Sequence, residues 1–170
     1  MKKLNELYPE VSSDVIVKNI QYSVSNVKRG DLFLCLATSN VDRYSQVDDA
    51  IKKGAVAVVV QDDVGYRDVP VIKVENVRRE LPFLCKKFFD DPCSKIKMIG
   101  VTGTDGKSSV GLLIQSLLGP SECGYFGNDF KKCYMFKEKT LVYNSKNLYS
   151  SIDEFVKFDC NYAVVEADSL

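Results

Sequence analysis

The segment KMIGVTGTDGKSSVGLL, residues 97–113, constrains the fold of this chain more than any other. An apolar run leads into Gly100, Gly103 and Gly106, and a run with helical spacing follows them. Glycine weakens strands and helices alike, so three glycines between two regular elements need a reason. The usual reason is close approach of the backbone to another group, and the adjacent Lys107 indicates that this group is negatively charged. The segment therefore predicts a strand, an anion-binding loop and a helix.

The rest of the chain predicts an α/β protein in two parts. Short apolar runs rich in β-forming residues alternate with runs of helical spacing. We expect residues 1–91 to form a small N-terminal α/β domain. Residues 92–170 read as an incomplete P-loop-type α/β nucleotide-binding domain with a mainly parallel sheet. In the first part, the sequence predicts strands over 30–37, 55–61 and 69–74, a helix ending at Gly54, and a helix over 77–89 that Pro82 kinks or delays.

The second part carries further expectations. The strand 97–102 is followed by a helix, and a strand over 161–168 ends in acidic residues. Residues 133–143 predict a hairpin, with Lys137–Lys139 at its tip. A capping box of Ser151 and Glu154 predicts the start of another helix. The buried face of the helix after the glycine loop is predicted to consist of Val110, Leu113, Ile114, Leu117 and Leu118.

Composition excludes several classes of function. The 23 basic and 23 acidic residues balance, which argues against a general nucleic-acid binder. The chain has no histidine, so Ser-His-Asp and Cys-His catalysis are excluded and a conventional zinc site is disfavoured. No apolar run approaches the roughly 18 residues of a membrane span, and no signal peptide is evident. The six cysteines include no C-x-x-C pair, and we expect reduced thiols in a cytoplasmic protein.

The glycine loop has the chemistry of a phosphate site. A strand that delivers such a loop to a helix N-terminus points several N–H groups into one concavity, and the helix dipole adds partial positive charge. Lys107 is placed to reach the outer phosphates, and the Ser108 hydroxyl is placed to bind magnesium. The generic pattern G-x-x-x-x-G-K-[ST] does not fit, because Val101 stands where its first glycine belongs. The alternative is a glycine-rich turn with a solvated lysine.

The pattern that does fit is G-x-[TS]-G-T-x-G-K-[ST], over residues 100–108. This loop resembles the ATP loop of the Mur ligase family, the amide ligases that build peptidoglycan precursors. The segments VKRGDLFLCL (27–36) and DDAIKKGAVAVVVQ (48–61) resemble two further family segments. Residues 69–104 are similar to the domain junction of the branch that adds the third residue of the peptide stem, the UDP-N-acetylmuramoyl-tripeptide synthetases. The resemblance covers nearly the whole chain.

The resemblance implies roles for individual residues. Lys107 is the implied catalytic residue, neutralising phosphate charge, while Ser108 and Glu166 are the implied magnesium ligands. The alternative for Glu166 is a solvated carboxylate at a strand end. The implied ATP-binding residues are Gly103, Thr104, Asp105, Gly106, Lys107, Ser108 and Ser109. The implied substrate-binding residues are Ser23, Ser25, Asp42, Asn144 and Ser145.

The chain departs from the family pattern mainly in the N-terminal part. YSVSN (22–26) stands where the tripeptide synthetases carry D-S-R beside the uridine nucleotide, and VDRYSQV (41–47) keeps only Asp42 of a D-G-H-x-F-I-like stretch. In the ATP loop the changes are mild, with Asp105 where asparagine is common and Ser108-Ser109 where two threonines are common. The sugar-nucleotide contacts are therefore altered far more than the ATP loop.

The resemblance implies an ATP- and Mg²⁺-dependent ligase of peptidoglycan synthesis. Such an enzyme phosphorylates the carboxylate of a UDP-MurNAc-dipeptide, and the amine of an amino acid then displaces the phosphate. These partners are small molecules, with no nucleic acid or membrane implied, and the location implied is cytoplasmic. The alternative is a non-catalytic or degenerate module that binds a nucleotide or a partner. A generic P-loop hydrolase or kinase is disfavoured by the shifted first glycine.

We expect these 170 residues alone not to catalyse ligation. The resemblance implies that a modified lysine, the adenine and ribose contacts and a C-terminal domain that binds the amino acid follow after Leu170. A synthesis assay with ATP, UDP-MurNAc-dipeptide and candidate amino acids measures this directly. Turnover above a no-enzyme control would contradict the expectation.

Overall fold

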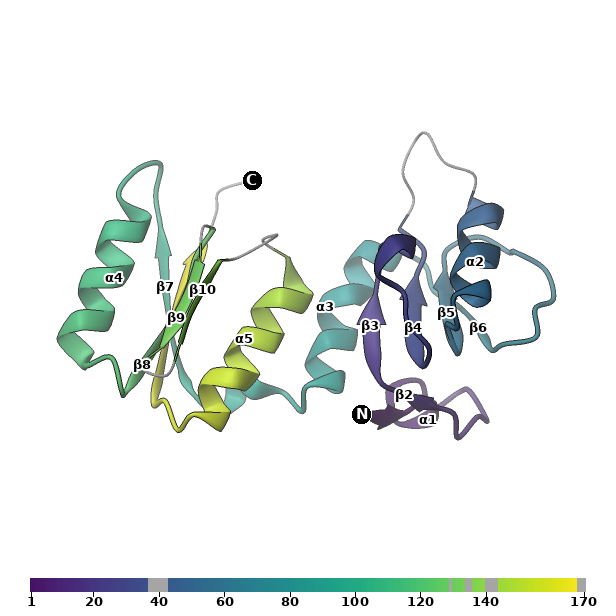
Figure 1. The fold of residues 1–170 in the computed structure, drawn as a ribbon, viewed down its shortest axis with the longest axis horizontal. Helices are drawn as coiled ribbons and strands as arrows, with labels where there is room; N and C mark the ends of the chain where they lie inside the picture. Colours follow the sequence, from purple (N-terminus) through teal and green to yellow (C-terminus); the bar gives the residue numbers. More distant parts are fainter. Residues whose placement is uncertain (37–42, 129, 134–135, 140–143, 168–170) are drawn as a thin grey trace. The chain divides into compact units, whose positions relative to one another are not determined.

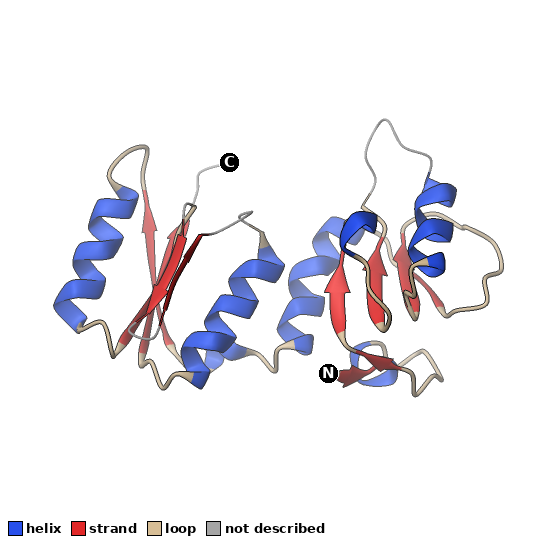
Figure 2. Ribbon diagram, in the orientation of Figure 1, coloured by secondary structure: helices blue, strands red, loops and turns tan. Residues whose placement is uncertain are grey.

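The computed structural model describes residues 1–36, 43–128, 130–133, 136–139 and 144–167. The chain divides into two compact units, Met1–Phe88 and Phe89–Leu170. Each unit has its own sheet and is described by itself (Figures 1 and 2). The division falls close to the boundary predicted between residues 91 and 92.

The first unit is built on a parallel sheet in the order β3-β4-β5-β6. A second, two-stranded sheet pairs β1 with β2 in antiparallel fashion. The sequence predicted β4, β5 and β6 from their apolar runs. The elements of this unit are β1 (Lys2–Lys3), α1 (Leu4–Leu7), β2 (Ile16–Val17), β3 (Asn19–Gln21), the 3-10 helix η1 (Val24–Asn26), β4 (Asp31–Leu34), α2 (Arg43–Lys52), β5 (Ala57–Val60), β6 (Val71–Lys73) and α3 (Val77–Phe88).

Helices α2 and α3 cover opposite sides of this sheet (Figure 1). Val47 and Ala50 of α2 are fully buried in a core that also contains Phe33 and Val58 of the strands. Parallel strands buried on both faces read as continuous apolar runs, which is why DLFL and AVVV show no alternation. Helix α3 runs through Pro82, so the predicted delay of its start is wrong.

The second unit contains a five-stranded sheet in the order β10-β9-β8-β11-β7. Strands β7, β8 and β11 are parallel, and β9 is antiparallel to both of its neighbours, β8 and β10. The predicted mainly parallel α/β architecture is therefore correct for the described sheet. The elements of this unit are the 3-10 helix η2 (Pro92–Ser94), β7 (Lys97–Thr102), α4 (Lys107–Leu118), β8 (Cys123–Phe126), β9 (Phe130–Cys133), β10 (Phe136–Lys139), α5 (Ser145–Lys157) and β11 (Tyr162–Ala167).

Helices α4 and α5 lie on opposite sides of this sheet (Figure 1). The face under α5 has a core of Phe126, Ile152, Phe155 and Val165, with smaller residues around them. The face under α4 has a different core, which includes Val101, Cys123, Tyr125 and Val164. Neighbouring residues of β8 and β11 therefore pack on opposite faces, as the alternation of side chains along a strand requires.

Helix α4 approaches the sheet through small and polar residues. A Cβ atom at Gly111 would lie 2.7 Å from Cε2 of Tyr125, so only glycine allows this approach. Gln115 is buried, and its Nε2 donates to the carbonyl oxygens of Cys123 at 2.8 Å and Lys132 at 3.0 Å. Gln115 thus joins the helix to two strands and satisfies carbonyl groups at the helix–sheet interface.

This contact makes the predicted buried face of α4 partly wrong. Ile114 and Leu118 are partly buried against the sheet. Val110, Leu113 and Leu117 are exposed, at 47%, 60% and 79% of their surface. The helix is apolar on more than one side, so periodicity alone did not identify the face that Gly111 brings against the sheet.

Two further predictions in this unit are wrong. Lys137–Lys139 lies inside β10, paired with β9, and is not the tip of the hairpin. Helix α5 begins at Ser145, with the Asn144 side chain accepting a hydrogen bond from the Asn147 N–H at 3.0 Å. Ser151 is already in the second turn, where its hydroxyl donates to the Asn147 carbonyl at 2.7 Å. Asn144 therefore caps the helix that Ser151 was predicted to cap.

All six cysteines are free thiols, as predicted. Cys93 is half-buried and the other five are buried. Burial raises the pKa of the Cys123 thiol to about 11, and that of Cys160 to about 11. Among the described residues, no helix is both long and apolar enough to cross a membrane.

Thiol titration tests this arrangement. At pH 8 we expect 5,5′-dithiobis(2-nitrobenzoic acid) to react quickly with Cys93 only, because the other five thiols are buried. For Cys123 and Cys160 the raised pKa also lowers the amount of thiolate, which is the nucleophile. In denaturant all six thiols should react. The substitution Cys93→Ser should remove the fast phase. A second fast thiol in the native chain would contradict the described burial.

Candidate phosphate-binding site

The loop between β7 and α4 is shaped by two glycines with positive φ. Gly103 has φ 147° and Gly106 has φ 76°, a region that residues with a Cβ rarely adopt. Gly106 immediately precedes α4, and no side chain caps the helix there. The first N–H groups of a helix have no partner within the helix. The loop therefore presents the positive end of α4 without a side-chain cap.

Lys107 folds back over this loop. Its Nζ donates to the Gly103 carbonyl at 2.9 Å and lies 3.5 Å from the Thr104 carbonyl. Both contacts are to the main chain of the loop itself. The ammonium group is thus held at the start of α4, beside the N–H groups that define an anion site there.

A pocket of about 380 Å³ opens over the loop. The predicted ATP-binding residues line it together, apart from Gly103, whose carbonyl accepts from Lys107. Glu166 lies 57 to 62 residues after these loop residues in the sequence, and it lines the same pocket. The lining residues are Thr104, Asp105, Gly106, Lys107, Ser108, Ser109, Asn128 and Glu166.

The parallel strands explain how these residues meet. In β11, Glu166 is in register with Val101 of β7, and Val165 is in register with Phe126 of β8. The carboxyl ends of all three strands therefore lie at one edge of the sheet, where ligands bind in open α/β sheets. Helix α4 begins at the same edge.

Glu166 is buried, with 1% of its surface exposed. Its Oε1 accepts a hydrogen bond from the Tyr125 hydroxyl of the neighbouring strand β8. The alternative of a solvated carboxylate at a strand end is therefore wrong. Burying a carboxylate is costly unless it is hydrogen-bonded or paired, and here the Tyr125 hydroxyl supplies a hydrogen bond.

The oxygen atoms that line the pocket fit magnesium as ligands. Mg²⁺ prefers oxygen ligands and is usually bound through one or two carboxylates together with phosphate oxygens and water. The pocket offers the Glu166 carboxylate and the Ser108 hydroxyl. The described residues contain no group of three His, Cys, Asp or Glu side chains able to hold a metal. A magnesium ion here would therefore depend on phosphate oxygens for much of its coordination.

None of the predicted substrate-binding residues is among the described residues that line this pocket. Ser23 and Ser25 belong to the first unit, where their hydroxyl oxygens are 2.8 Å apart. Asn144 and Ser145 stand at the start of α5, and neither is among the residues that line the pocket. Asp42 lies outside the described residues. These five assignments stay predictions.

Sequence reasoning missed two residues of this region, Asn128 and Tyr125. Asn128 lines the pocket, and Tyr125 holds Glu166. The available signal was their position in ECGYFGN, a short segment between two turns whose length and composition suit a strand. No local motif marks either residue.

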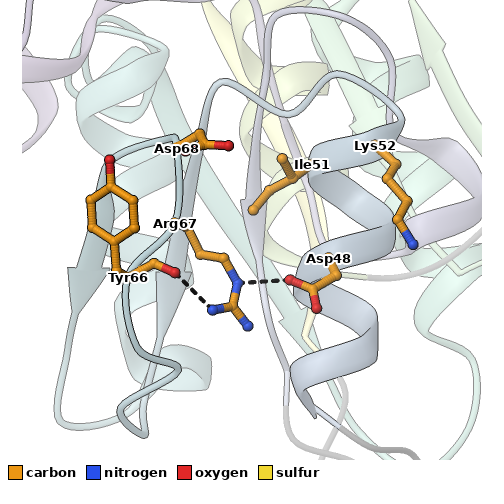
Figure 3. Close-up of a pocket in the computed structure, with 6 residues that line it drawn as sticks. All are labelled: Asp48, Ile51, Lys52, Tyr66, Arg67 and Asp68. Atoms are coloured by element: carbon orange, nitrogen blue, oxygen red, sulfur yellow. Dashed lines mark hydrogen bonds and ion pairs between the residues drawn. The ribbon is translucent and has the colours of Figure 1, made fainter.

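The first unit has a pocket of similar size, about 390 Å³, between α2 and the loop before β6. Figure 3 shows Arg67 extending toward Asp48 of α2, and the Nε–Oδ1 distance is 2.7 Å. The Arg67 guanidinium also donates to the Tyr66 carbonyl at 2.8 Å, while the Tyr66 side chain is 88% exposed. The Arg67 charge in this pocket is thus paired with a carboxylate of the chain, unlike the cation of a phosphate site.

No family model matches this chain. Comparison with known proteins does find sequence relatives. A UDP-N-acetylmuramoyl-L-alanyl-D-glutamate–2,6-diaminopimelate ligase of Clostridium perfringens is 41% identical over 103 residues, which cover 60% of this chain and 21% of that protein. The ligase of the same name from Clostridium tetani is 33% identical over 178 residues, covering 99% of this chain and 36% of that protein. The chain thus spans about a third of the length of this relative. These relatives are Mur ligases, so the predicted resemblance is confirmed.

Solved structures show the same fold. A UDP-N-acetylmuramoyl-L-alanyl-D-glutamate–2,6-diaminopimelate ligase aligns with a TM-score of 0.79 at 19% identity, covering 98% of this chain and 36% of that one. The MurF ligase of Thermotoga maritima, solved in complex with ADP, aligns with a TM-score of 0.62 at 18% identity, covering 92% of this chain and 33% of that one. The predicted α/β fold class is confirmed.

The conformation of the loop can be tested with a pair of glycine substitutions. Gly106→Ala should lower the free energy of unfolding by about 1–2 kcal/mol, because a Cβ is unfavourable at φ 76°. Gly100→Ala is the matched control, since a Cβ there meets nothing within 4 Å. It should be neutral or slightly stabilising. Urea unfolding measures both, and equal effects of the two substitutions would contradict the described loop.

Proposed function

We propose that this chain, which is related to the Mur ligases along nearly its whole length, carries the ATP-phosphate and magnesium site of an amide-bond ligase. The observation that supports this most directly is the pocket over the β7–α4 loop. There Lys107, Ser108 and Glu166 come together from a helix start and a separate strand. A glycine turn with a solvated lysine would not require a buried carboxylate beside it.

The physical role of the loop is to hold negative charge. The N–H groups at the start of α4 and the Lys107 ammonium provide donors for phosphate oxygens. Lys107 contributes charge neutralisation, which matters where a phosphoryl group and a carboxylate must approach each other. The contact of Nζ with the Gly103 carbonyl, at 2.9 Å, keeps this charge within the loop before any ligand binds.

Ser108 and Glu166 would hold magnesium. When bound, the ion would neutralise phosphate oxygens and orient them. The chain's own contribution is a hydroxyl at the start of α4 and, near the end of β11, a carboxylate held by Tyr125. Both belong to regular elements, which position side chains more tightly than loops do.

The reaction that we propose for the complete enzyme is addition of an amino acid to UDP-MurNAc-dipeptide through an acyl phosphate. The Mur ligase relatives support it, since those proteins are named for ligating 2,6-diaminopimelate to UDP-N-acetylmuramoyl-L-alanyl-D-glutamate. In this proposal the first unit binds the UDP-sugar part with Ser23 and Ser25. Asp42, Asn144 and Ser145 are the other candidates for substrate contacts.

The substitution Lys107→Ala tests the phosphate site. It should weaken binding of ATP in the presence of Mg²⁺ by about tenfold or more, because hydrogen bonds to charged groups contribute about 1.5–3 kcal/mol. Isothermal titration calorimetry measures the Kd. Lys95→Ala is the matched control, since Lys95 is an exposed lysine of the same unit that does not line the pocket. Equal affinities for both variants would contradict the proposed role.

A second titration, with UDP-MurNAc-dipeptide, separates the proposal from its alternative. Binding of both ligands supports a ligase whose first unit still recognises a UDP-sugar. Binding of ATP alone supports the phosphate site and contradicts the role of Ser23 and Ser25. Binding of neither ligand would favour the non-catalytic module.

A further inference from the structure

Glu166 is held by a residue from outside the glycine loop. Tyr125 of β8 is in register with Val164 of β11, so Glu166 lies two residues further along, on the same face of the sheet. Tyr125 and Glu166 are each 1% exposed, and the Tyr125 hydroxyl donates to Oε1 of Glu166. The contact is therefore a buried one between diagonal neighbours on adjacent strands, behind the wall of the phosphate pocket.

Two glycines enclose this pair. On the α4 side, a Cβ at Gly111 would lie 2.7 Å from Cε2 of Tyr125. After β8, a Cβ at Gly127 would lie 2.8 Å from Oε1 of Glu166 and 2.8 Å from Cζ of Tyr125. Neither distance is found for real Cβ atoms, so both positions exclude larger residues while the pair keeps this geometry. The tyrosine ring is packed closely from two directions.

We propose that Tyr125 is a positioning residue, which orients the Glu166 carboxylate for a magnesium ion in the phosphate pocket. This inference rests on the proposed function, because it assigns a role at the same site. Tyr125 does not line the pocket and acts only through Glu166.

A tyrosine suits this role for an electrostatic reason. Its hydroxyl is neutral, so it fixes the carboxylate without cancelling the negative charge that attracts the cation. An ionised carboxylate has about four lone-pair sites on its two oxygens, and one donor occupies a single site. A lysine or arginine in the same place would pair with the carboxylate and compete with the metal. Partners that orient a metal ligand typically contribute about ten- to a hundredfold to metal affinity.

The substitution Tyr125→Phe removes the hydroxyl and keeps the packed ring. We expect it to weaken binding of Mn²⁺, used as a spectroscopic substitute for Mg²⁺, by about tenfold in the presence of ADP. Electron paramagnetic resonance of free Mn²⁺ measures this affinity. Binding of ADP in EDTA should be unchanged, because the loop and Lys107 remain. A loss of ADP binding in EDTA equal to the loss in Mn²⁺ would indicate a structural effect and overturn the proposal.

Tyr162→Phe is the matched control. Tyr162 is the first residue of β11, whereas Glu166 lies near the carboxyl end of the same strand. Tyr162 does not line the pocket. It should leave the Mn²⁺ affinity unchanged. If Tyr125→Phe also leaves it unchanged, the positioning role is overturned while the proposed function stands. If the unsubstituted chain binds neither ADP nor Mn²⁺–ADP, the proposed function fails as well, and the two failures are distinguishable.

Two further variants keep the test independent of the stability of Tyr125→Phe. Gly127→Ala keeps both partners but places a methyl group against them, and it should also weaken Mn²⁺ binding. In a Glu166→Gln background, Tyr125→Phe should cause no additional loss, since the two residues act as one unit. Additive losses in this double-mutant cycle would show that Tyr125 does not act through Glu166.

Discussion

The parallel pairing of β11 with β7 on one side and β8 on the other is the constraint on which the site depends. It fixes Glu166 opposite Val101 and places Phe126 beside Val165. Parallel strands end at the same edge, so residues from three distant segments meet there without any local signal. The loop after β7 then starts α4 at this edge, which adds the helix N-terminus and Lys107. Without this pairing, the glycine loop would be only a turn before a helix.

The loop and the strand ends were predictable because their information is local. The strand, the glycines and the following helix are adjacent in sequence. Glycine adopts positive φ readily, as Gly103 and Gly106 do here. The presence of an acidic residue near the end of the last strand was also visible. Its burial was not, because burial of Glu166 is created by neighbours on other strands. Tyr125 precedes it by 41 residues.

The rotation of α4 could not be predicted for a related reason. Apolar residues occupy several sides of this helix, so its period identifies a helix but not a unique buried face. The choice is made by Gly111 and Gln115, whose partners are a tyrosine ring and two strand carbonyls. The helix packs against the sheet through Gly111 and the buried Gln115 amide, and it leaves Leu113 and Leu117 exposed. Such a choice depends on the shape of the opposite surface, which the sequence of the helix does not contain.

The same shape complementarity ties the stability of the domain to its site. Gly111 brings α4 against Tyr125, and Tyr125 holds the carboxylate at the pocket wall. Lys107, at the start of the same helix, is fixed by a carbonyl of its own loop. The fold thus orients both charged groups before a ligand binds. The conformational entropy of these two side chains is therefore lost on folding and not on ligand binding. Because one helix–sheet contact supports both groups, a change in the packing of α4 would alter the lysine and the carboxylate together.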